Sequence, residues 1–174
     1  MTDATSQPVF VVPADASSDA TAELVGSKAA QLARMSRLGL SVPPAFVMPT
    51  SLCNGVNQKD EAALRTLKSG LRLGVARLEA ATSRRFGDSR LPLFVSVRSG
   101  AARSMPGMLD TILDVGMNND TVQGLIRLAG NPRLAWDSYR RFVQSYSEVV
   151  DGVRNVSTTL RPGDLEFKLG FLVF

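Results

Sequence analysis

The chain has 174 residues, a length that fits one globular domain or a compact piece of a larger one. Of these residues 44% are hydrophobic and 21% charged, and the net charge is +4. Histidine is absent, which excludes histidine-based triads, histidine metal ligands and a phosphohistidine within these residues. A single cysteine excludes an internal disulfide, the scattered basic residues do not indicate a nucleic-acid partner, and no apolar run approaches the roughly 20 residues that span a bilayer.

The N-terminal third predicts a short strand and a first helix. Residues 1–8 read as disordered, and because they lack a secretory signal we expect a cytoplasmic protein. Residues 9–12 predict a strand. Ser27 is the expected N-cap of a helix that Gly39 ends, with apolar residues at helical spacing: Leu32, Met35 and Leu38.

The middle of the chain predicts a short strand at 46–48 and then a long amphipathic helix over 60–83. One face of that helix is apolar, with Leu64, Leu67, Leu71, Val75 and Leu78. Gly70 and Gly74 each weaken it by about 1 kcal/mol relative to alanine.

Two strands and two helices follow. The segment "LFVSVR" (93–98) alternates like a strand, and residues 111–116 predict a second one. Asp120 is the expected cap of a short helix, and Asn131 with Pro132 begins a long one that ends before Gly152. The apolar end of the chain, 171–174, would be exposed unless it pairs as a strand. The fold class is therefore α+β.

Lys28 follows Gly26 and Ser27 at the expected helix start, where backbone N–H groups and the helix dipole favour an anion. A solvated lysine explains the same pattern, and the residues are no P-loop.

Arg98 ends an apolar strand and precedes side chains too small to obstruct a ligand. A guanidinium there could grip phosphate in a two-point geometry, or it could pair with Asp110 or Asp114. In the following loop, Gly107 would let backbone approach a nucleotide that Met105 and Met108 cover, or the loop is a surface turn.

Three stretches together resemble the N-terminal part of the pyruvate, phosphate dikinases: "VGSKAAQLARMSRLGLSVPPAFVMPTSLCN", "PLFVSVRSGAARSMPGMLDTILDVGMN" and "GNPRLAWDSYRRFVQSYSEVVDGV". The similarity covers residues 9–152, and the most specific part is S-V-R-S-G-A-x-x-S-M-P-G-M-x-D-T. One departure is Gly26-Ser27-Lys28-Ala29, where the family usually has Gly-Gly-Lys-Gly.

The resemblance implies an ATP-grasp-like nucleotide-binding domain that is incomplete here and uses ATP with Mg²⁺. In the family, the lysine matched by Lys28 and the arginine matched by Arg98 lie against the ATP phosphates and carry the catalytic role. The following loop lies over the nucleotide, which gives these binding residues: Ser99, Gly100, Ala101, Ser104, Met105, Gly107, Met108, Asp110 and Thr111. Partners would be a separately encoded phosphohistidine domain and a pyruvate-binding domain.

Residues 153–174 read as a divergent or truncated tail. Within it, "DLEF" resembles a family pair of magnesium-binding carboxylates, Asp164 and Glu166, but four residues are equally compatible with chance. Three hypotheses stay open: the ATP-binding part of a dikinase, a nucleotide- or protein-binding module without catalysis, and a truncated remnant.

Overall fold

The computed structural model describes residues 8–12, 21–99, 111–151 and 171–173, and these mix helices with strands, as α+β requires. The helices are α1 (Ala22–Val25), α2 (Ser27–Arg37), α3 (Leu52–Asn57), α4 (Glu61–Thr82), α5 (Asn119–Ala129), α6 (Pro132–Tyr146) and the π-helix η2 (Ser147–Asp151). The strands are β1 (Val9–Val12), β2 (Ala45–Val47), β3 (Arg85–Phe86), β4 (Pro92–Leu93), β5 (Val95–Ser99), β6 (Thr111–Val115) and β7 (Phe171–Val173).

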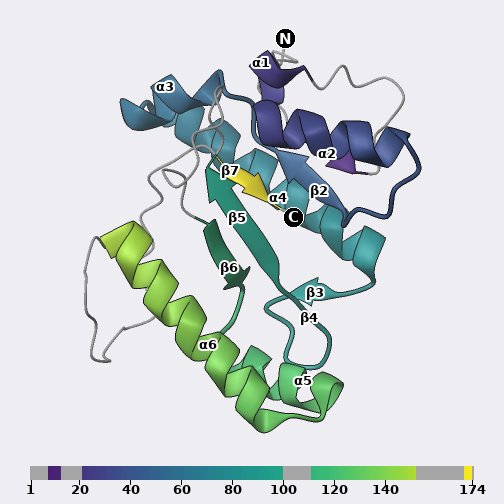
Figure 1. The fold of residues 1–174 in the computed structure, drawn as a ribbon. Coiled ribbons are helices and arrows are strands. Elements are labelled where there is room, and N and C mark those ends of the chain that lie inside the picture. Colours follow the sequence, from purple (N-terminus) through teal and green to yellow (C-terminus); the bar gives the residue numbers. More distant parts are fainter. Residues whose placement is uncertain (1–7, 13–20, 100–110, 152–170, 174) are drawn as a thin grey trace.

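Five strands form one antiparallel sheet in the order β1-β2-β7-β5-β6 (Figure 1). The C-terminal strand β7 therefore lies in the interior of the sheet, between β2 and β5. Of the apolar end that the sequence leaves exposed unless it pairs as a strand, residues 171–173 do pair as a strand. A second, two-stranded sheet joins β3 to β4 in parallel.

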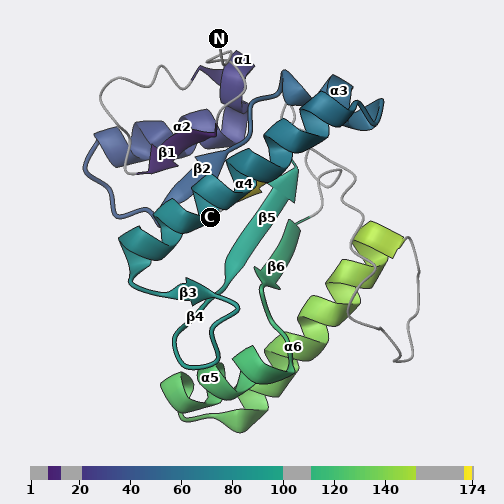
Figure 2. The same cartoon turned by 180° about the vertical axis from the view of Figure 1, so that it is seen from behind.

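The two faces of the large sheet carry different helices. The α4 face holds a buried cluster that joins the sheet to the helix and includes Phe46, Val97, Leu67 and Leu78. On the other face, α2 packs through Ala29 and Ala33 against β2 residues: Ala45 and Val47. Figures 1 and 2 show the two helices on opposite sides of the strands.

The long helix α4 confirms the prediction for 60–83. Asp60 is its N-cap and accepts a hydrogen bond from the Ala63 amide at 2.8 Å. Its two glycines have a packing role that propensity alone does not reveal. A Cβ on Gly74 would lie 2.3 Å from the Phe46 ring, and one on Gly70 would lie 2.5 Å from the Met48 methyl group. The glycines let α4 approach the sheet closely.

The prediction for the first long helix was right about its end and wrong about its cap. Gly26, with φ of 81°, is the N-cap of α2, and Ser27 is its first helical residue, because the short helix α1 precedes it directly. At the other end, the Leu40 amide donates to the Met35 carbonyl at 3.1 Å and the Gly39 amide to the Ser36 carbonyl at 3.0 Å, which is a Schellman motif.

The apolar spacing that predicted α2 does not mark its buried face. Met35 is 40% and Leu38 69% exposed, whereas the buried positions are alanines that let the helix lie close to β2.

Asp120 is likewise not the cap of α5. Asn118 is the N-cap, and its side chain accepts hydrogen bonds from the Asp120 and Thr121 amides at 2.9 Å. Asn131 caps α6 as predicted and accepts from the Leu134 amide. The sequence patterns did not predict α1, α3 or the β3–β4 pair, nor that the last turn of the long C-terminal helix, residues 147–151, is a π-helix. In the part of the chain that the structure describes, no helix is long and apolar enough to cross a membrane.

Gly74→Ala tests the close approach of α4. Helix propensity alone predicts stabilisation by about 1 kcal/mol, but the clash with Phe46 predicts a net loss of about 1–3 kcal/mol. Urea unfolding measures this sign. The loss of stability caused by Gly74→Ala should be smaller in a Phe46→Leu background than in the wild type. Strictly additive effects of the two substitutions would contradict the proposed contact.

Asp114→Asn tests how much the half-buried charge of Asp114, a strained residue in β6, lowers the stability of the fold. Asp114 has φ of 58°, and burial raises the pKa of its carboxyl group. The folded state then binds the proton of this carboxyl group more tightly than the unfolded chain does. The stabilisation from that proton is therefore present at low pH and is lost as pH rises through the titration of the carboxyl group. We expect Asp114→Asn to raise the Tm at pH 7 and to raise it less at pH 4. Each 1 kcal/mol gained in the free energy of unfolding corresponds to roughly 2–4 °C in Tm. Asp114→Ala, which also removes the charge but is strained at positive φ, should gain less. An equal gain at both pH values would contradict the role of the charge.

Candidate functional site

Lys28 lies in the first turn of α2, at a helix start with open backbone donors. No side chain caps this end of the helix, and the first amides of a helix have no intrahelical acceptor. The position of this end is fixed by Thr50, whose hydroxyl donates to the Glu23 carbonyl at 2.9 Å and whose amide donates to the Leu24 carbonyl at 3.2 Å. The arrangement provides donors, a positive dipole end and one mobile ammonium for an anion.

Arg98 lies near the end of β5, and the strand register determines which face its side chain joins. Arg98 pairs with Leu172, Leu172 pairs with Val47, and Val47 pairs with Val9. Residues directly opposite on antiparallel strands share a face. Because Val47 packs against α2, Arg98 must belong to the α2 face. Val97, one residue earlier, belongs to the α4 face.

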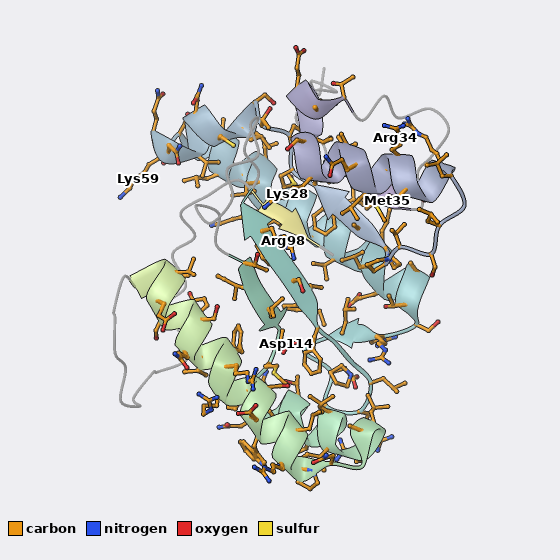
Figure 3. The ribbon with its side chains drawn as sticks, viewed as in Figure 1. Lys28, Arg34, Met35, Lys59, Arg98 and Asp114 are labelled. Atoms are coloured by element: carbon orange, nitrogen blue, oxygen red, sulfur yellow. The ribbon has the colours of Figure 1, made fainter. Side chains whose placement is uncertain are left out.

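Arg98 therefore lies on the face of the sheet that α2 covers, and Lys28 belongs to the first turn of that helix. Arg98 is two strand positions from Val47, which corresponds to about 10 Å. Figure 3 shows both labelled side chains near the end of β5, whereas Arg34 lies toward the other end of α2. Arg98 is half-buried, with its Nε atom buried. Two cationic groups and a helix N-terminus at one place are what a polyphosphate requires.

The structure decides one of the two ion pairs considered for Arg98. Burial raises the pKa of Asp114, whereas a guanidinium in contact with this carboxylate would lower it. Figure 3 places Asp114 at the other end of the sheet from Arg98. Asp114 is therefore not the partner of Arg98, and Asp110 lies outside the described residues.

Several predicted site residues lie outside the part of the chain that the structure describes. They are Gly100, Ala101, Ser104, Met105, Gly107, Met108, Asp110, Asp164 and Glu166. Besides Lys28 and Arg98, two predicted site residues are described. Thr111 pairs with Arg98 across β5 and β6, and the Ser99 backbone pairs with Phe171. Among the described residues, no group of three carboxylate or cysteine side chains could hold a metal ion.

Sequence reasoning missed two residues that position the site. Gly26 needs its positive φ to turn the chain from α1 into α2, and a glycine directly before a predicted helix was the available signal. Thr50 anchors α1 from a distance of 27 residues along the chain, which no local pattern marks.

Comparison with known proteins gives a consistent set of relatives. No protein-family model matches the chain. It is similar to the pyruvate, phosphate dikinase of Rhizobium meliloti, with 49% identity over 129 residues, which are 74% of this chain and 14% of the relative. The enzyme of that name from Clostridium symbiosum is 43% identical over 127 residues, or 73% of this chain and 14% of the relative. Pyruvate, phosphate dikinase 1, chloroplastic, of rice is 46% identical over 132 residues, or 74% and 13%.

The match extends over most of this chain but over little of each relative. The relatives come from bacteria and a plant, and they carry the same name. By its sequence the chain is homologous to one part of the pyruvate, phosphate dikinases, and it spans about 14% of the length of the relatives it matches.

Proposed function

We propose that this chain binds Mg-ATP through the phosphate groups and forms the ATP-binding portion of a dikinase-like phosphotransferase. The observation that carries the proposal is the strand register, which brings Arg98 to the face on which α2 presents Lys28. The relatives' shared name supports the phosphotransferase class. In the family reaction, ATP, phosphate and pyruvate give AMP, diphosphate and phosphoenolpyruvate.

Each group has a distinct task in this proposal. The guanidinium of Arg98 grips two phosphate oxygens, and the open amides of α2 with the Lys28 ammonium hold the neighbouring phosphate. Phosphoryl transfer needs mainly fixed positive charge at the transferring oxygens, and these residues supply it. Asp164 and Glu166 are the proposed magnesium ligands, since carboxylate oxygens suit this cation.

The resemblance implies a histidine as the phosphoryl acceptor, and the chain contains no histidine. The acceptor must therefore come from outside this sequence. We therefore propose a phosphohistidine domain and a pyruvate-binding domain as partners, and the cytosol as the compartment. The lack of histidine equally favours the second candidate function, a nucleotide-binding module without catalysis.

Mg-ATP binding, measured by isothermal titration calorimetry, tests the site directly. Arg98→Ala should weaken binding by about 10–100-fold, because a charge-assisted bidentate contact contributes about 1.5–3 kcal/mol. Lys28→Ala should weaken it by about tenfold. Arg34→Ala removes the same charge from the far end of α2 and should leave the affinity within about twofold, as expected for a screened surface charge.

A second pair of variants separates charge from geometry. Arg98→Lys keeps the positive charge but loses the planar two-point contact, so it should bind Mg-ATP more tightly than Arg98→Ala and more weakly than the wild type. Equal loss of affinity in Arg34→Ala and Arg98→Ala, with all variants folded by circular dichroism, would contradict a localised phosphate site.

The isolated chain should bind ATP without turning it over. Incubation with γ-labelled ATP should leave no acid-labile label on the protein, because no histidine is present. Phosphate release should be weak or absent, because the chain spans only about 14% of the length of its relatives. Steady turnover that Arg98→Ala abolishes would contradict this prediction and would show a complete active site.

A further inference from the structure

We propose that the slot between β2 and β5 accepts a strand in trans and that a second copy of this chain supplies it. In this arrangement two copies exchange their β7 strands, so that each sheet is completed by the partner copy.

In the part of the chain that the structure describes, the slot has two hydrogen-bonding edges, and β7 joins them. On one side, β7 pairs with β2 through Phe46 and Val47. On the other, it pairs with β5 through Val97, Arg98 and Ser99. Within the described residues, β2 and β5 have no direct pairing. An empty slot would leave two facing rows of unsatisfied backbone groups beside a buried core, so a strand must occupy it.

The slot is selective for an apolar strand with intact amides. Phe46 and Val47 are at most 2% exposed, and Val97 is 8% exposed. A charged strand would have to be desolvated there, and proline would remove a donor from the ladder. The C-terminal sequence "FLVF" meets these conditions, and every copy of the chain carries it.

Exchange keeps all of these contacts and changes only the connection. The same register forms whether β7 comes from its own chain or from a second copy, so the two forms differ mainly in chain entropy, which makes swapping a low-cost route to a dimer. The sequence from 152 to 170 joins η2 to β7. A connection of this length reaches at most about 65 Å when extended, which exceeds the diameter of a domain of this size, about 40 Å.

Protein concentration during refolding should decide between the two forms. A strand tethered to its own slot has an effective concentration on the order of 1 mM. Refolding at 0.5–1 mM chain, near that same order of magnitude, should therefore give a large dimer fraction. Refolding at about 1 μM should give monomer, because the tethered strand then wins about a thousandfold.

A designed disulfide reports which chain supplies the strand. In a Cys53→Ser background, Val47→Cys and Leu172→Cys occupy a directly opposite pair of β2 and β7, a spacing that suits a disulfide. The protein is refolded at both concentrations and oxidised after folding, and the products are separated on a denaturing, non-reducing gel. The matched control carries Val9→Cys and Val47→Cys, a pair within the β1–β2 ladder that exchange does not separate.

The proposal predicts that the β2–β7 disulfide joins two chains after refolding at high concentration and closes within one chain after refolding at low concentration. The control should stay within one chain at both. An intrachain β2–β7 disulfide at every concentration would overturn the exchange. No disulfide in a folded protein would overturn the occupation of the slot by β7, and a ladder above the dimer would overturn reciprocal exchange between two copies. None of these results depends on ATP binding.

Discussion

The structure depends on three residues at the end of the chain that pair in the interior of the sheet. Strand β7 provides the hydrogen bonds between the β1–β2 pair and the β5–β6 pair. It also fixes the register between them, and the register decides which side chains share a face. A shift of one residue would exchange Arg98 for Val97 on the α2 face and would remove the cation from the site. The candidate phosphate site is therefore a consequence of how this sheet is closed.

The second requirement is a helix that can lie close to the sheet with an open N-terminus. Buried alanines on α2 provide the close contact with β2, while Gly26 turns the chain from α1 into α2. On the other face, the glycines of α4 provide an equally close contact with Phe46 and Met48. Small residues thus set the distances on both faces.

Local patterns in the sequence predicted most elements, because the signals for α4, β5, β6 and α6 lie within the elements themselves. The alternation of Leu93, Val95 and Val97 correctly assigned one face to the core, which left Arg98 for the other. The cap predicted at Ser27 was wrong because Gly26, at positive φ, takes the N-cap position where the chain turns from α1 into α2. The cap predicted at Asp120 was wrong because the Asn118 side chain accepts from the first amides of α5. The interior position of β7 and the anchoring by Thr50 are contacts between distant parts of the chain, and no local pattern encodes them. The local pattern gave only a weak signal for Lys28, and the family resemblance added the expectation that it lies against the ATP phosphates.

The central claim is that a helix start and a strand end, joined through the sheet register, form one anion site. The most direct measurement is an amide chemical-shift titration of the isotope-labelled chain with Mg-ATP. The account predicts that the amides of Gly26–Ala29 and of Val97–Ser99 shift together with a single affinity, while those of α5 stay unchanged. Shifts confined to only one of the two segments, or shifts centred on α5 and α6 in a folded chain, would contradict it.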